Sequence, residues 1–199
     1  MTGTTANPRT PHLFAADEPE LVRAPGTTYV ATVGSGRPGT ADFYRRKELV
    51  AAIVRALPAQ LRVADADGVV EVLYRYPVGS VPVDIADFYT VNPIDDLQYT
   101  VVAQVGAGTS EDDVRTAALT VPAARNEDVS LVALPEQLVV QILHHGPFAD
   151  EYATLDRLGE FAAARGLSRA GDHHEVHLDP FSATSRQDRL RTILRDPVA

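Results

Sequence analysis

The sequence has no cysteine and no tryptophan, and Lys47 is its only lysine. The absence of cysteine excludes disulfides and thiolate chemistry. No stretch approaches the roughly 18 consecutive apolar residues that a membrane span needs, so a membrane partner is not expected. The first twenty residues lack the charged region and apolar core of a secretory signal. Together these absences predict a cytoplasmic protein.

Basic side chains are outnumbered by acidic ones: 18 lysines and arginines stand against 27 aspartates and glutamates, which gives a formal net charge of −9. Nucleic-acid binding needs clustered lysine and arginine to meet the phosphates, so no nucleic acid is expected as a partner. A net negative charge instead favours cationic ligands. Apolar residues make up 45% of the 199 residues, which is enough to bury a core in one domain or two small ones.

Two segments of the chain share one pattern. Thr28–Leu57 reads TYVATVGSGRPGTADFYRRKELVAAIVRAL, and Leu138–Leu167 reads LVVQILHHGPFADEYATLDRLGEFAAARGL. Each has a β-branched run, a turn with glycine and proline, and an amphipathic helix. Each is followed by a strand with a glutamate in it, VVEVLYRYP and HHEVHLDP. The repeat predicts an α+β fold of two pseudo-symmetric strand–helix–strand–strand modules that form an antiparallel sheet, with a cleft between them.

The same pattern sets the expected boundaries. Residues 1–26 are polar and rich in proline and threonine, and they predict a flexible N-terminal arm that lies across the body. The domain covers residues 27–199, with module one at about 27–106 and module two at about 135–198. Between the modules, we expect a helix at Ser110–Leu119 and a loop at Pro122–Leu134.

The words VVQILHHGPFADEYATLDRL, GDHHEVHLDP and RLRTILRDPV together resemble the GyrI-like small-molecule-binding domain of the gyrase-inhibitor and effector-binding superfamily. The similarity is strongest to the stand-alone branch of that family, and it extends more weakly over residues 27–198. The resemblance implies two strand–helix–strand–strand modules around a cleft, in agreement with the repeat. It also implies ligands that are bulky, flat and often cationic, held among aromatic side chains and a buried glutamate.

The resemblance further implies a set of site residues. The glutamate of the family's HHE strand corresponds to Glu175, and a second family glutamate corresponds to Glu71. Tyr74 and Tyr99 stand where the family often has tryptophan, so the stacking surface is smaller and a hydroxyl is gained. The candidate ligand-binding residues are Glu175, Glu71, Tyr74, Tyr76, Tyr99, Phe148 and His177.

Two main functions fit this resemblance. The first is binding of lipophilic aromatic or cationic small molecules, in a sequestering or sensing role, with Glu175 as the polar anchor. The alternative is a hydrolase that opens cyclopropane rings of genotoxic natural products, with Glu175 or Glu71 activating water and a tyrosine hydroxyl orienting the substrate. A third is docking on a protein such as gyrase. The chain has no room for a helix-turn-helix domain ahead of residue 27, so a complete transcription factor is not expected.

The chemistry of Glu175 does not separate binding from catalysis. In an apolar pocket a carboxylate resists ionisation, so we expect the pKa of Glu175 to be raised. A cationic ligand would offset that cost, whereas a neutral substrate would meet a general base suited to neutral pH. Strand alternation alone also allows roles without a ligand. Glu175 would then be an exposed strand carboxylate, and the tyrosines would serve packing of the core.

The remaining polar motifs point to structural roles. The paired histidines lack metal-ligand spacing, so neither a metal nor a cofactor is expected. Ser35 lies outside any strand–GxSxG–helix elbow. We expect Asp150 and Glu151 to serve the N-terminus of their helix, and His144 or His174 to fix a turn by a hydrogen bond. The oligomeric state stays open.

Overall fold

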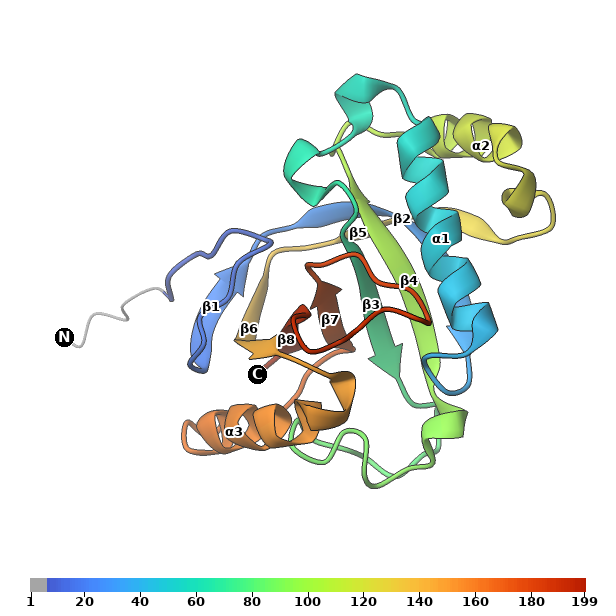
Figure 1. Cartoon of the computed structure of the whole chain (residues 1–199). Coiled ribbons are helices and arrows are strands. Elements are labelled where there is room, and N and C mark those ends of the chain that lie inside the picture. Colours follow the sequence, from blue (N-terminus) through green and yellow to red (C-terminus); the bar gives the residue numbers. More distant parts are fainter. Residues whose placement is uncertain (1–6) are drawn as a thin grey trace.

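The computed structural model describes residues 7–199 (Figure 1). Over these residues the chain forms one eight-stranded sheet in the order β1-β6-β8-β7-β3-β4-β2-β5, and every neighbouring pair is antiparallel. The helices are α1 (Ala41–Ala56), α2 (Glu111–Thr120) and α3 (Glu151–Ala163). The strands are β1 (Glu20–Ala24), β2 (Thr27–Ser35), β3 (Val70–Arg75), β4 (Gln98–Val105), β5 (Val129–Leu134), β6 (Gln137–His145), β7 (His173–His177) and β8 (Arg191–Pro197).

The predicted pseudo-symmetry is present. Module one runs β2–α1–β3–β4 and module two runs β6–α3–β7–β8. In both modules the third strand lies between the first and the second. The modules join where β3 pairs with β7, at the middle of the sheet, with Val72 opposite Glu175. The α+β fold with an antiparallel sheet is therefore confirmed.

Two short links require the sheet to curl. Only Pro25 and Gly26 separate β1 from β2, and only Pro135 and Glu136 separate β5 from β6. Yet β1 and β6 lie at one end of the strand order, and β2 and β5 lie at the other. The two links touch, because a Cβ atom at Gly26 would lie 3.3 Å from the Glu136 nitrogen. The predicted loop at Pro122–Leu134 is wrong for Val129–Leu134, which is an edge strand and so lacks a fully buried face.

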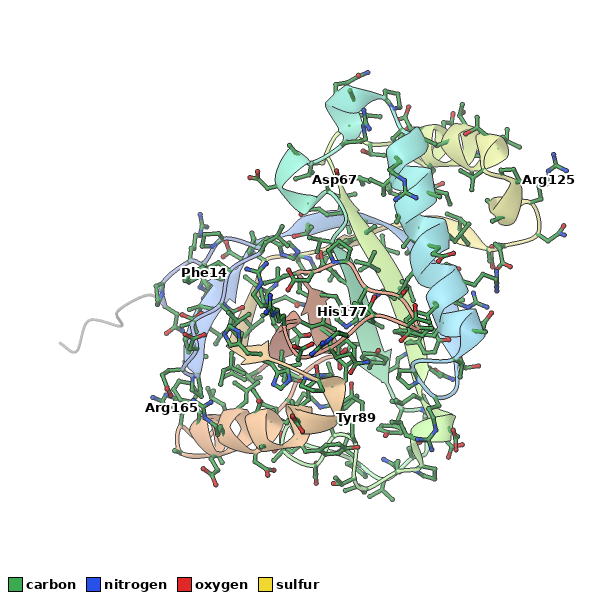
Figure 2. All side chains as sticks on the ribbon, in the orientation of Figure 1. Phe14, Asp67, Tyr89, Arg125, Arg165 and His177 are labelled. Atoms are coloured by element: carbon green, nitrogen blue, oxygen red, sulfur yellow. The ribbon has the colours of Figure 1, made fainter. Side chains whose placement is uncertain are left out.

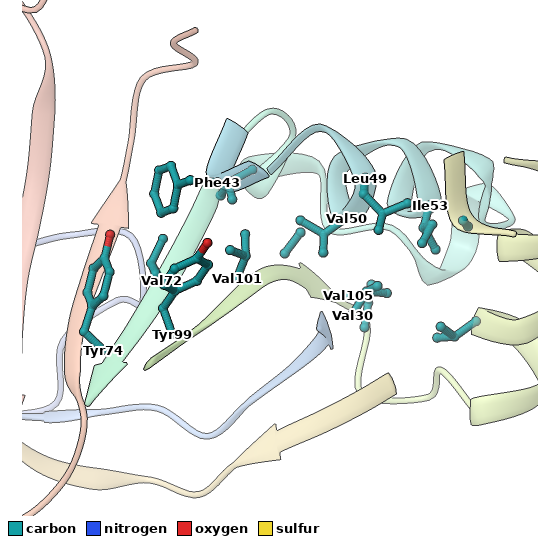
Figure 3. Close-up of a cluster of buried hydrophobic side chains, with 14 of the residues drawn as sticks. Val30, Phe43, Leu49, Val50, Ile53, Val72, Tyr74, Tyr99, Val101 and Val105 are labelled. Atoms are coloured by element: carbon teal, nitrogen blue, oxygen red, sulfur yellow. The ribbon is translucent and has the colours of Figure 1, made fainter. Parts of the chain in front are cut away.

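Helices α1 and α3 cover the same face of the sheet, one over each module (Figure 1). Helix α1 begins at Thr40, whose side chain accepts a hydrogen bond from the Phe43 nitrogen at 3.3 Å. Its apolar side packs on strand residues such as Val72 and Val101 (Figure 3). Helix α3 lies close to the chain before β4, because a Cβ atom at Gly159 would come within 2.7 Å of the Ala86 Cβ atom. Glycine at this position therefore sets how closely the two segments pack.

The N-terminal arm covers the other face. Ala15 packs against Val176 and Ile193, and the Ala16 carbonyl accepts a hydrogen bond from the Leu143 nitrogen at 2.8 Å. The expectation of an arm without regular structure is wrong for Glu20–Ala24, which form β1 on the edge of β6. The arm does lie across the body from residue 7 on, and residues 1–6 lie outside the described residues. Over residues 7–199, no helix has both the length and the apolar character to cross a bilayer.

Candidate ligand-binding site

A cavity of about 280 Å³ opens between the N-terminal ends of α1 and α3. Its floor is the junction of β3 and β7, so residues from both modules line it. The loop from β7 to β8 crosses this region in front of the sheet (Figure 1). The cleft expected between the modules is therefore present. Its aromatic walls are Phe43, Tyr44, Tyr74, Tyr89, Phe148, Tyr152 and Phe181.

Glu175 is the carboxylate at the floor of this aromatic cavity. Strand alternation turns it toward the helices, while Val176 faces the arm. Its side chain is buried, with only 4% of the residue exposed. The Tyr89 hydroxyl donates a hydrogen bond to Oε1 at 2.6 Å, and His177 Nε2 donates to Oε2 at 3.0 Å. Tyr89 and His177 are labelled in Figure 2. His173 Nε2 lies 3.7 Å from Oε1.

These partners keep Glu175 ionised. Burial opposes its charge, but the nearby positive charge of His173 and the hydrogen bond from His177 outweigh burial, and they hold the pKa of Glu175 well below its ordinary value. The predicted rise in this pKa is therefore wrong, because the pocket around the carboxylate is apolar only in part. Burial also works against charge on His173, yet Asp196, at 2.9 Å from Nδ1, and Glu175 raise its pKa to about 9.

A second carboxyl group lines the same cavity. Glu151 begins α3, and only 4% of the residue is exposed. Burial raises its pKa well above the ordinary value, and the charge of Glu175 raises it further. Asp150 is the N-cap residue of α3 and Glu151 lies in its first turn, so both acids lie at the helix N-terminus as expected, although the Asp150 side chain makes no capping hydrogen bond. The two carboxyl groups of the cavity are therefore shifted in opposite directions, Glu175 toward the ionised form and Glu151 toward the protonated form.

A lysine extends the polar contacts of the floor. Lys47 Nζ lies 3.2 Å from His177 Nδ1 and 3.1 Å from the centre of the Phe181 ring. Burial lowers the pKa of Lys47 to about 7, although Glu175 opposes this shift. Burial and the charge of Lys47 lower the pKa of His177 to about 4. His177 is therefore neutral, with Nδ1 accepting from Lys47 and Nε2 donating to Glu175.

Glu71 lies on the opposite face of the sheet. It is fully buried beneath the arm, where His12 and His174 contact its two oxygens at 2.8 and 2.7 Å, and the Tyr29 hydroxyl donates at 3.1 Å. Although burial opposes ionisation, the two histidines hold the pKa of Glu71 below its ordinary value. The predicted place of Glu71 in the cleft is wrong. The two glutamates occupy matching positions in the sequence repeat. In the sheet, however, Glu175 lies opposite Val72, so Glu71 points to the other face.

The comparisons with known proteins agree with this geometry. A family model described as "GyrI-like small molecule binding domain" matches residues 86–195, which is more than half of the chain. This chain belongs to the GyrI-like family. No curated protein matches it.

Solved structures share the GyrI-like fold over nearly the whole chain. An uncharacterized conserved protein from Listeria innocua is 22% identical with a TM-score of 0.71, and the match covers 92% of this chain and 93% of that one. A hydrolase from Listeria innocua is 19% identical with a TM-score of 0.72, and 94% of each chain is covered. SAV2435 bound to tetraphenylphosphonium is 11% identical with a TM-score of 0.51, covering 92% of this chain and 94% of that one.

Within this GyrI-like cavity, four of the predicted residues come together: Glu175, Tyr74, Phe148 and His177. Two others lie outside it. The Tyr99 ring is buried 5.4 Å from that of Phe43 (Figure 3), and the Tyr76 ring packs on Phe88. Tyr99 is a core residue and Tyr76 is a half-buried residue packed against the core, in agreement with the alternative interpretation that these strand tyrosines serve packing.

Several groups in or beside the cavity are missing from the predicted site, among them Tyr89, Phe181, Glu151 and Lys47. Tyr89 and Phe181 lie in segments without a helical or strand period, so their pattern carried no signal. Lys47 did carry one, because it shares the buried side of α1 with Phe43 and Val50, where a charged residue is rare. His144 does fix a turn, through Thr154 at 2.9 Å and the Pro147 carbonyl. Within residues 7–199, no cluster of three or more histidine, aspartate or glutamate residues could hold a metal ion.

Proposed function

We propose that this protein binds bulky aromatic small molecules, cations included, in the cavity between α1 and α3. The observation that carries the proposal is an aromatic wall around a buried carboxylate that stays ionised. Flat rings stack on tyrosine and phenylalanine, and a ligand cation over such a ring is stabilised by about 0.5 to 2 kcal/mol. SAV2435, which shares the fold, is bound to the organic cation tetraphenylphosphonium, and this supports a ligand of that class.

The size of the cavity limits how a ligand enters. At about 280 Å³ it is near the lower end of the roughly 300–1,000 Å³ typical of small-molecule sites. It therefore accepts the flat aromatic part of a bulky molecule, with the remainder at the mouth beside Tyr152, which is 43% exposed.

Fluorescence titration with ethidium, a planar cation, tests this proposal. We expect saturable binding in the micromolar range and at least about tenfold weaker binding for Glu175→Gln, since the variant keeps the shape and removes the charge. Glu111→Gln is the matched control, because Glu111 is exposed on α2, and its affinity should equal that of the unaltered protein. Binding weaker than about millimolar, or equal affinity for both variants, contradicts the proposal.

Hydrolysis of the bound molecule is a second candidate, favoured by the two carboxyl groups. Environments that push the pKa values of two neighbouring acids apart assign an acid and a base. Here burial and the charge of Glu175 favour the protonated form of Glu151, whereas the partners of Glu175 favour its ionised form. A Listeria innocua structure of the same fold is described as a hydrolase. The substrate class is an aromatic natural product with a strained cyclopropane ring, as the family resemblance implies.

The chemistry of ring opening fits this pair. The water oxygen forms a bond to a ring carbon while a strained carbon–carbon bond breaks, and the electron pair of that bond passes to the conjugated part of the substrate. Glu151 donates its proton to this electron-rich part, and Glu175 accepts the proton released by the attacking water. A weakly basic carboxylate is adequate, because water becomes strongly acidic as its oxygen bonds to carbon. The product has gained one water.

Incubation with a cyclopropane-bearing aromatic alkylator tests this activity. Mass spectrometry should reveal a ring-opened product that carries one added water. Glu175→Gln and Glu151→Gln should each lose turnover by at least about a hundredfold, the usual contribution of an acid or base, and Glu111→Gln should not. Unchanged turnover in both cavity variants excludes this mechanism, and no product at all limits the protein to binding.

A further inference from the structure

Four side chains form one continuous chain of contacts across the floor of the cavity. Tyr89 and His177 hold the two oxygens of Glu175, and Lys47 holds the far nitrogen of His177. The four side chains come from three distant parts of the sequence, namely α1, β7 and the segment before β4. In the proposed function Glu175 is the charged group, and Tyr89 and His177 hold it in place, whereas Lys47 has no role.

A second cavity lies on the far side of Lys47. It has a volume of about 180 Å³, and it shares His177 and Phe181 with the aromatic cavity. Lys47, His177 and Phe181 therefore form a partition between the two cavities. The charged residues that line the second cavity are Glu48 and Arg55 from α1 and Asp179 from the loop after β7. This cavity connects Lys47 with solvent while Glu175 stays on the aromatic side.

We propose that Lys47 is a positioning residue that keeps His177 neutral, with its Nε2 hydrogen on Glu175, so that Glu175 remains the charged group of the aromatic cavity. The consequence for ligands rests on the proposed function, whereas the state of His177 does not.

The hydrogen-bond geometry allows one arrangement. Below its pKa of about 7, Lys47 is an ammonium that can only donate, so His177 Nδ1 must be the acceptor in their 3.2 Å contact. The one hydrogen of a neutral imidazole is then on Nε2, where the Glu175 carboxylate accepts it at 3.0 Å. A second proton on His177 would place an N–H group against the ammonium, and the imidazolium would neutralise Glu175. The like charge of Lys47 and the burial of the ring both oppose this second proton. The low pKa of His177, about 4, agrees with a neutral ring.

The sole lysine permits a direct test by nuclear magnetic resonance. Protein labelled with ¹⁵N at the lysine Nζ has one such side-chain signal, which reports Lys47 alone. Imidazole ¹⁵N shifts report the protonation and tautomer of His177, assigned by comparison with His177→Gln. Two variants separate charge from packing: Lys47→Met keeps the length of the side chain, and Lys47→Arg keeps its charge and donors.

We expect His177 to be neutral at pH 6, where Lys47 is still mostly an ammonium, with hydrogen on Nε2. Its titration should move up by about 1 to 3 pH units in Lys47→Met and stay low in Lys47→Arg. Hydrogen on Nδ1 in the unaltered protein, or an unchanged His177 titration in Lys47→Met, would overturn the proposal. These readouts need no ligand, so failure of ethidium binding with the expected shifts would remove only the proposed function.

Discussion

The stability of the protein should change with pH in opposite directions when Lys47 or His173 is removed. Both side chains are buried, with 6% and 0% of each residue exposed, and both titrate between pH 6 and 11. Lys47→Met removes one titration and His173→Gln removes the other. In the unaltered protein the two effects oppose each other, so its free energy of unfolding should change little with pH.

The sign follows from the two pKa shifts. The pKa of His173 rises on folding from 6.5 to about 9, because Asp196 and Glu175 outweigh burial, so its stabilisation is full below pH 6.5 and is lost through pH 9. The pKa of Lys47 falls from 10.5 to about 7 through burial, so its destabilisation is full below pH 7 and is relieved toward pH 10.5.

The magnitudes are similar in the window from pH 7 to pH 9. Applying about 1.4 kcal/mol per pKa unit, His173 loses about 2 kcal/mol of stabilisation and Lys47 regains about 2 kcal/mol. We therefore expect the free energy of unfolding to fall by about 2 kcal/mol across this window in Lys47→Met and to rise by about 2 kcal/mol in His173→Gln.

Urea unfolding followed by circular dichroism at pH 7, 8 and 9 measures these slopes. The double variant is the control, and its unfolding free energy should be nearly constant. A Lys47→Met protein whose stability stays constant or rises from pH 7 to pH 9 would refute the reasoning about His173.

Three further substitutions test individual contacts by thermal and urea unfolding. Tyr89→Phe removes the 2.6 Å hydrogen bond to Glu175 and should destabilise the fold by about 1 to 3 kcal/mol, while unchanged stability would mean that this bond is absent in solution. Gly159→Ala places a methyl group within 2.7 Å of its neighbour and should cost about 1 to 3 kcal/mol, whereas Gly108→Ala, with open space around it, should be neutral, and equal losses would contradict the packing. His12→Ala leaves a buried carboxylate without one of its partners, so a loss of about 1 to 3 kcal/mol is expected, and no loss would show that the arm does not anchor there.

The fold was predictable because local signals agree along most of the chain. The apolar runs and turns of the two repeats predict strands and helices that the structure contains, and the Thr40 cap marks the start of α1. The edge strands β1 and β5 were not predictable in the same way. Strand β1 pairs with β6, the first strand of module two, and β5 pairs with β2, the first strand of module one. Their half-exposed residues show no clear alternation of apolar and polar side chains.

The site was predictable in part, for a different reason. Glu175 followed from the family resemblance, and the structure places it at the cavity floor. The predicted place of Glu71 in the cleft was wrong because a shift of one residue along a strand moves a side chain to the opposite face of the sheet. Val72, and not Glu71, lies opposite Glu175. Tertiary packing alone brings Tyr89 into hydrogen-bond contact with Glu175 and places Glu151 in the same cavity, and that packing also reverses the predicted shift in the Glu175 pKa.

A crystal structure with bound ethidium tests the central claim most directly. We expect the planar cation between α1 and α3, stacked on aromatic side chains of the cavity and on the side of Glu175 that faces the helices. Ethidium bound only elsewhere on the molecule, with the space between Phe148 and Phe181 unchanged, would contradict the account.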